Sequence, residues 1–148
     1  MPHTNDQNAL RLLQAADVFR ARLAGEFGAV HGISVNEFML LKHLAQAPLT
    51  RLPRVELARR MHVSASTVTR MTAPMEKIGL VGRAADARDA RTSFVVLTQA
   101  GRGRLEEAEA SFAKHADRVF EDRWTAEERA QFAALMQRLV QNAPGPLT

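Results

Sequence analysis

An arginine-bearing polar hexapeptide, residues 86–91, lies between two short apolar runs in a chain that is otherwise patterned for helices. Val81 precedes the hexapeptide, and residues 94–97 (Phe-Val-Val-Leu) follow it. Two β-prone runs joined by a short polar segment are typical of a hairpin with an exposed tip. A tip carrying Arg88 and Arg91 can reach a phosphate backbone or a narrow groove, although a charged hairpin taken alone can also be a solvated loop.

The middle of the chain is strongly basic. Residues 51–104 contain eleven Lys or Arg and only four Asp or Glu, whereas the net charge of all 148 residues is +4. Ten of these eleven cations are arginines, which favours bidentate contacts to phosphates or base edges. The charge distribution therefore predicts a polyanionic partner for this part of the chain.

The composition and the motifs of the sequence exclude several classes of protein. The chain has no cysteine, no apolar run near the ~20 residues that span a bilayer, and no signal-peptide pattern at its start. No glycine-rich phosphate loop, nucleophile motif or closely spaced cluster of metal ligands is present. We therefore expect a soluble, cytoplasmic protein that is not an enzyme and has no cofactor, no metal site and no membrane partner.

Apolar spacing and capping residues predict six helices around the hairpin. The first runs from about Asn8 to Phe27 and is interrupted by Gly28 and Gly32. Ser34, in a capping box with Glu37, caps the second helix, which ends before Pro48. Pro53 suits the first turn of the third, in which Val55, Leu57, Ala58 and Met61 are apolar. Ser64 caps the fourth, which runs from Ala65 to about Ile78 and is closed by Gly79. Thr98 caps the fifth, whose apolar stripe runs from Leu105 to Val119, and Thr125, in a capping box with Glu128, caps the sixth, which runs to about Val140.

The order of four helices, a hairpin and two helices is that of a winged helix-turn-helix. The predicted fold is thus mainly α with a small β-wing, in one chain of residues 1–148. Residues 34–97 would form the winged helix-turn-helix DNA-binding lobe, and residues 8–32 and 98–142 a helical dimerisation lobe. The second helix of the pair can enter a major groove while the wing reaches the backbone or the minor groove.

The segment from Ser64 to Arg70 begins a helix with hydroxyl and cationic side chains. Ser and Thr can contact base edges or phosphates, and a helix N-terminus has unpaired N–H groups suited to an anion. A Ser/Thr-rich helix start can also be merely exposed. The wing that follows it favours the nucleic-acid interpretation.

Four motifs in this order resemble the multiple-antibiotic-resistance regulator (MarR) family: residues 63–70, 75–81, 86–91 and 97–101, with Leu57-Ala58 also matching. The resemblance implies a homodimeric transcriptional regulator, a repressor in preference to an activator, that binds a palindromic double-stranded DNA operator. It also implies the contacts: Ser64, Ser66, Thr67, Thr69 and Arg70 facing the major groove, Arg88 or Arg91 entering the minor groove, and Asp89 orienting the wing arginines through a charge-assisted pair.

Two residues depart from the family pattern. Many members carry an acid at the position of Ala73, which braces the wing arginine, so the wing here is expected to be looser or braced from elsewhere. Pro74 lacks an N–H and crowds the carbonyl of Arg70, which predicts a kink in the helix.

The resemblance further implies release of DNA by a small aromatic or phenolic effector bound between the two lobes. The candidate ligand-binding residues are Phe19, Arg20 and Phe38; alternatively, the phenylalanines are core and Arg20 is solvated surface. Two further alternatives stay open. The apolar helices could close a monomeric core, and the fold could be a winged-helix protein-interaction module without specific DNA binding.

Overall fold

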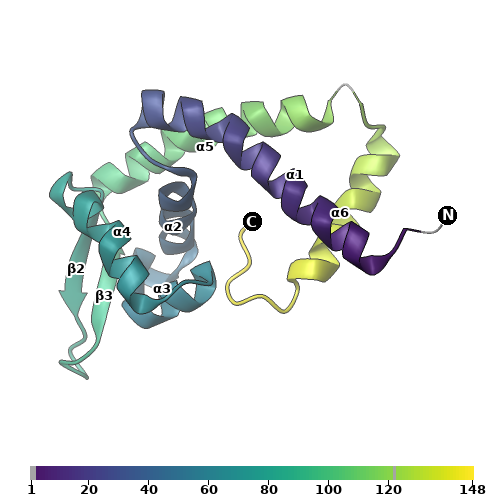
Figure 1. Cartoon of the computed structure of the whole chain (residues 1–148). Coiled ribbons are helices and arrows are strands. Elements are labelled where there is room, and N and C mark those ends of the chain that lie inside the picture. Colours follow the sequence, from purple (N-terminus) through teal and green to yellow (C-terminus); the bar gives the residue numbers. More distant parts are fainter. Residues whose placement is uncertain (1–2, 122) are drawn as a thin grey trace.

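The computed structural model describes residues 3–121 and 123–148, and it is mainly helical with one small antiparallel sheet, as expected from the sequence (Figure 1). The elements in chain order are α1 (Asn5–Glu26), η1 (Phe27–His31), α2 (Val35–Gln46), η2 (Pro48–Thr50), β1 (Arg51–Pro53), α3 (Arg54–Met61), α4 (Ala65–Lys77), β2 (Val81–Ala85), β3 (Ser93–Leu97), α5 (Gln99–Phe120) and α6 (Ala126–Val140). The helices α2, α3 and α4 gather with the hairpin at one end of the molecule, and α1, α5 and α6 extend away from it (Figure 1).

The predicted caps set the helix starts. Ser34 accepts a hydrogen bond from the backbone N–H of Glu37 (3.0 Å), and the Glu37 carboxylate accepts one from the N–H of Ser34 (2.9 Å), which confirms the capping box. Ser64 caps α4 and Thr98 caps α5 in the expected way. At α6 the Thr125 hydroxyl accepts from the N–H of Glu128 and donates to its carboxylate, so Glu128 binds the cap side chain rather than the cap backbone.

The expectation that Gly28 interrupts the first helix is wrong. The helical path continues through Gly28 as the π-helical turn η1, and it ends at Gly32, which has a φ of +64°. The turn is held against α5 at His31. Its ring shares a 2.7 Å hydrogen bond with the Ser111 hydroxyl, and its carbonyl accepts one from the Arg104 guanidinium. Tertiary contacts of this kind override the local tendency of one glycine to end a helix.

The sheet has a third strand that the sequence patterns missed. Its order is β1-β3-β2, with Leu52 opposite Val95 and both side chains buried. Pro53 ends β1 and precedes α3, so its predicted place inside the first turn of that helix is wrong. Edge strands tolerate proline because its missing N–H is not needed there. Of the four apolar residues named for α3, Leu57 and Ala58 are buried and Met61 packs against the core, whereas Val55 is 69% exposed.

One core runs through α2 and joins α1, η1 and α5 to α3, α4 and the sheet. Leu23, Phe27, Leu41 and Leu44 are almost fully buried there, and the ring of Phe38 packs edge-on against that of Phe27. Burial of each such side chain contributes about 1.5–3 kcal/mol. The apolar residues at the start of α1 and along α6 instead remain exposed.

Candidate nucleic-acid interface

The turn between α3 and α4 orients the second helix. His62 adopts a left-handed conformation, with a φ of +56°, and the N–H of Val63 donates to the carbonyl of Ala58 (3.1 Å). Val68 and Met75 anchor α4 because their side chains are fully buried. The opposite face of the helix is consequently directed away from the core. The helix continues past Pro74 to Lys77, and the kink expected at Pro74 stays a prediction.

The predicted recognition residues lie on this outward face. Ser64, Ser66, Thr69 and Arg70 are exposed, and Thr67 is half-buried. The Ser64 hydroxyl accepts from the N–H of Thr67 (3.1 Å) and also lies 3.0 Å from the Ser66 hydroxyl and 2.9 Å from the Thr67 hydroxyl. Ser64 is thus engaged mainly as the cap. The Arg70 guanidinium donates to the Thr67 hydroxyl (3.2 Å), which orients the guanidinium along the helix surface.

A second cation, Arg54, lies beside this face and was not among the predicted site residues. It is the first residue of α3, and its guanidinium donates to the Thr69 hydroxyl (2.7 Å). The same hydroxyl donates to the carbonyl of Ala65 (3.1 Å), so its orientation is determined from both sides. From the sequence, Arg54 could be recognised only as one residue of the basic segment, because its neighbours in the chain do not indicate that it contacts Thr69.

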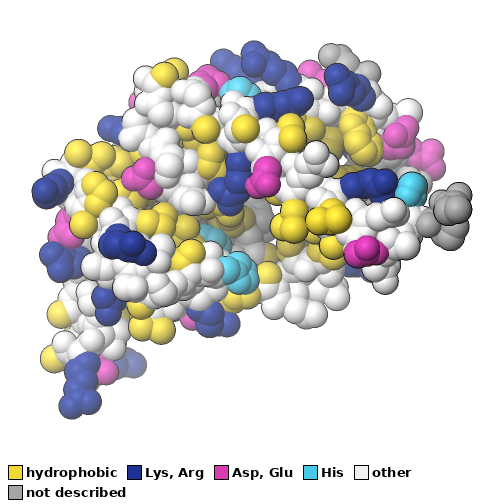
Figure 2. All heavy atoms as spheres, viewed as in Figure 1, with side chains coloured by type: hydrophobic (Ala, Val, Ile, Leu, Met, Phe, Trp, Pro, Cys, Tyr) yellow, Lys and Arg dark blue, Asp and Glu magenta, His cyan; other side chains and the backbone are white. Residues whose placement is uncertain are grey.

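The wing ends in a compact, exposed tip. Strand β2 pairs with β3 from Val81 opposite Leu97 to Ala85 opposite Ser93. The tip carries both Arg88 and Arg91, which are exposed, and Figure 2 shows cationic side chains at the extremity of this projection. The tip therefore presents positive charge far from the core.

The expected ion pair of Asp89 with the wing arginines is absent among the residues described by the structure. Asp89 instead accepts from the backbone N–H of Arg91 (2.9 Å) and from the Thr92 hydroxyl (3.3 Å). Asp86 accepts from the backbone N–H of Arg88 in the same way (2.9 Å). A short Asp side chain reaches the backbone two residues on more readily than a distant guanidinium. Both acids therefore shape the tip and leave the guanidinium groups outside.

The wing is braced from a different position on α4 than Ala73. Glu76 accepts from the Arg83 guanidinium of β2 at 3.0 Å, one helical turn beyond Ala73. A hollow of about 290 Å³ lies between α4 and the wing, with Arg54, Thr69, Glu76 and Arg83 among its lining residues. The interface is thus a face of α4, a cationic hollow and an arginine-bearing tip.

Two arginines of α3, unlike those of the tip, are paired with a carboxylate. Glu56 accepts hydrogen bonds from Arg59 (2.9 and 2.8 Å) and from Arg60 (3.0 Å), and these guanidinium groups lower the pKa of Glu56 to about 2. Two cations of α3 therefore share one anion. Within the described residues, no carboxylate lies within ion-pair distance of Arg88 or Arg91.

The three predicted ligand residues line one cavity of about 400 Å³ between α1, α2 and α5. The Phe38 ring stacks on that of Phe112 at a centroid distance of 5.3 Å, and the Phe19 ring meets Phe112 edge-on at 5.7 Å. Arg20 reaches its rim but donates to neutral partners, Asn36 Oδ1 (2.7 Å) and a methionine sulfur. Sequence reasoning missed a second cation of this cavity, Lys42.

Within residues 3–121 and 123–148, no three His, Cys, Asp or Glu side chains are arranged to hold a metal ion. Within the same ranges no helix has both the length and the hydropathy needed to cross a bilayer.

Comparison with known proteins gives a consistent result. The MarR family model matches residues 33–93. The HTH-type transcriptional repressor YetL of Bacillus subtilis is 30% identical over 73% of this chain, which covers 64% of YetL, so the match spans less than two thirds of that relative. Two solved structures share the fold. Sco3205 of Streptomyces coelicolor, a MarR family transcriptional regulator in complex with DNA, has a TM-score of 0.80 at 23% identity and coverages of 97% and 96% of this chain and that one. A probable transcriptional regulator from Pseudomonas aeruginosa has a TM-score of 0.77 at 27% identity and coverages of 91% and 98%. All of these names describe transcriptional regulators and none an enzyme.

Proposed function

Because this chain belongs to the MarR family, we propose that it is a DNA-binding transcriptional regulator that acts as a homodimer on a palindromic operator. In this proposal residues 34–97 form the DNA-binding lobe, and residues 8–32 and 98–142 form the dimerisation lobe. The site residues contribute shape, hydrogen bonds and charge, and no chemical step is involved.

The observation that carries the proposal is the pairing of two cationic features at one end of the molecule. The outward face of α4 presents Ser66, Thr69 and Arg70, and the wing presents Arg88 and Arg91 beyond it. A helix of this kind fits a major groove, where an arginine can read guanine and hydroxyls can bind phosphates. The exposed wing guanidiniums suit the narrower groove and its phosphates.

The dimer is supported by the apolar surface that a single chain leaves uncovered. Leu10 and Leu13 of α1 are each 64% exposed, and Leu135 and Leu139 of α6 are 57% and 63% exposed. The two leucines of each helix share one face of it, and exposed apolar faces of this kind mark an interface. A second copy, packing α1 and α6 against their equivalents, would cover it and space two α4 helices for two half-sites.

We further infer a repressor that a small ligand releases from DNA. YetL is named a repressor, and the cavity lined by Phe19, Arg20 and Phe38 joins α1 and α5 of one lobe to α2 of the other. A ligand that favours one arrangement of these helices shifts the population between arrangements. The spacing of the two α4 helices would change with it.

The alternative of a winged-helix module that binds protein instead of DNA is less well supported. Such a module has no need of a hydroxyl-rich helix face with an exposed Arg70, nor of an unpaired arginine tip. Steep salt dependence of duplex binding distinguishes the two functions, because it counts the phosphates whose counterions are released.

The test is fluorescence anisotropy with a duplex from the region upstream of the protein's own gene, against a scrambled duplex, across a salt series. Sequence-selective binding that weakens steeply with salt supports the proposal. Absence of binding at low salt would refute it. Sedimentation equilibrium of the same protein tests the dimer, and a monomer at the binding concentration would refute that part.

A further inference from the structure

The last residues of the chain fold back onto the cavity between α1, α2 and α5. They leave the end of α6 and turn back toward α2 (Figure 1). Leu147 and Thr148 are among the residues that line the cavity. Leu147 is half-buried, and the lining residues around it include Phe19, Phe38 and Phe112. Part of the cavity wall is thus formed by the chain's own last residues.

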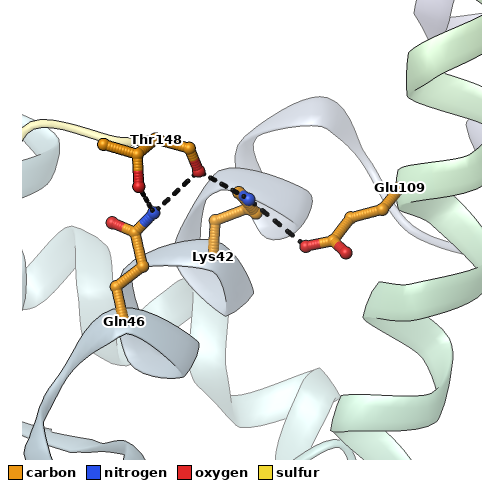
Figure 3. Close-up of polar contacts among 4 residues, drawn as sticks. All are labelled: Lys42, Gln46, Glu109 and Thr148. Carbon is orange, nitrogen blue, oxygen red and sulfur yellow. Dashed lines mark hydrogen bonds and ion pairs between the residues drawn. The ribbon is translucent and has the colours of Figure 1, made fainter.

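Polar contacts hold the tail in this position (Figure 3). The backbone oxygen of Thr148 accepts from Lys42 Nζ (3.1 Å) and from Gln46 Nε2 (3.0 Å), and Gln46 also donates to the Thr148 hydroxyl (3.0 Å). Lys42 and Gln46 are one helical turn apart and therefore share a face of α2. Glu109 of α5 accepts from the same ammonium group (3.3 Å), so Lys42 links the tail to both helices.

Gly145 allows the tail to turn toward the cavity. Its φ is +61°, and a Cβ at this position would lie 2.6 Å from Cδ of Arg60. The turn therefore passes close against α3, which belongs to the predicted DNA-binding lobe. The segment connects α6, whose exposed face we assign to the dimer, with α2 and α3.

We propose that residues 144–148 cover one wall of the cavity and engage its donors Lys42 and Gln46, and that a small acid with an apolar body competes with them for these donors. The acid would place its apolar part where Leu147 lies and its two oxygens where Thr148 receives hydrogen bonds from Lys42 and Gln46. Binding of the ligand then releases residues 144–148, the strap that connects α6 with α2. The regulatory meaning of this competition rests on the proposed function, whereas the competition itself does not require DNA.

The experiment measures binding of 2-naphthoate by isothermal titration calorimetry. The chain lacking residues 144–148 is expected to bind about tenfold more tightly than the full chain, since the competing segment is gone; tenfold corresponds to about 1.4 kcal/mol. Lys42→Met in the shortened chain should weaken binding, because it removes the cation but keeps a long apolar stem. Asn142→Ala, an exposed position just before the strap, is the control and should match the full chain.

A second measurement follows the tail directly. The chain has no cysteine, so Pro146→Cys allows a single trifluoromethyl label for ¹⁹F NMR at an exposed position. Saturating 2-naphthoate should move the resonance toward that of the same label on a free peptide of residues 141–148. Thermal melts of all variants confirm that each is folded.

Equal affinity of the full and shortened chains would overturn the proposal, as would a ¹⁹F resonance that naphthoate leaves unmoved. Failure of both chains to bind would also overturn it, because an emptied apolar cavity beside Lys42 should accept an amphipathic anion. A chain that shows the tenfold change but binds no duplex would refute the proposed function and leave the competition intact. The two ideas therefore fail separately.

Discussion

Replacing Gly101 with alanine tests how α5 docks onto the end of α4, where the wing and the long helices meet. A Cβ at Gly101 would lie 2.0 Å from the carbonyl oxygen of Leu80 and 2.8 Å from Cδ1 of Leu97. The Leu80 oxygen is itself held by the N–H of Thr98 (3.2 Å) and by its hydroxyl (2.9 Å). Backbone held in this way cannot move aside as a flexible side chain would.

The cost follows from that geometry. Overpacking a buried site costs about 1–3 kcal/mol, and the better helix propensity of alanine offsets up to about 1 kcal/mol. We expect a net loss of roughly 1–2 kcal/mol in the free energy of unfolding. Gly103 is the matched control, since it lies in the same helix with no atom within 4 Å of a built Cβ. Gly103→Ala should stabilise the protein by up to about 1 kcal/mol.

Thermal unfolding followed by circular dichroism at one protein concentration measures the difference. For a chain of about 150 residues, 1 kcal/mol shifts Tm by about 2–4 °C. Gly101→Ala should therefore melt below the wild type and at least about 2 °C below Gly103→Ala. If Gly101→Ala melts at or above its control, the close approach of α5 to Leu80 is not a constraint in solution.

Four further changes test the interface and its charges. Arg91→Ala should lower the slope of log affinity against log salt by about 1, and an unchanged slope in the anisotropy series would remove this residue from the phosphate contacts. Arg70→Ala should cost about 1–3 kcal/mol of duplex affinity, mainly on the cognate site; equal loss on a scrambled duplex would argue against base contact. Glu76→Gln should change the free energy of unfolding by less than about 1 kcal/mol, because the ion pair of Glu76 with Arg83 is largely exposed. The substitution should nevertheless speed amide hydrogen exchange in the wing. Unaltered exchange would show that the pair does not brace the wing. Glu56→Gln should lower the free energy of unfolding by about 0.5 kcal/mol above pH 4.5. Because the pKa of Glu56 is lowered to about 2, the difference in stability between the two proteins, measured by urea unfolding, should shrink as the pH falls from 4.5 toward 2. A difference that stays constant over this pH range would contradict the prediction.

Local chemistry accounts for most of what the sequence predicted correctly. Ser34, Ser64 and Thr98 begin helices as expected, because a cap is satisfied within three residues of the chain. The hairpin around residues 86–91 likewise joins the expected runs, because its two strands are close together along the chain. Phe19, Arg20 and Phe38 line one cavity, and their role in binding a ligand stays a prediction.

The failures involve partners that are distant in sequence. Strand β1 has three residues and no pattern of its own, and it exists because Leu52 pairs with Val95 of β3. Helix α1 continues into η1 past Gly28 because Ser111 and Arg104 hold His31. The brace that family members build from an acid at the position of Ala73 is made here by Glu76 and Arg83, which lie on different elements.

The sequence by itself determined the element types, the basic centre and the family, because these depend on spacing, composition and short motifs. The tertiary structure alone decided which groups meet: Arg54 with Thr69, Glu76 with Arg83, and Lys42 with Thr148. Lys42 and Thr148 are 106 residues apart along the chain. Contacts at such separations depend on how the helices pack, and the local pattern around either residue carries no record of its partner.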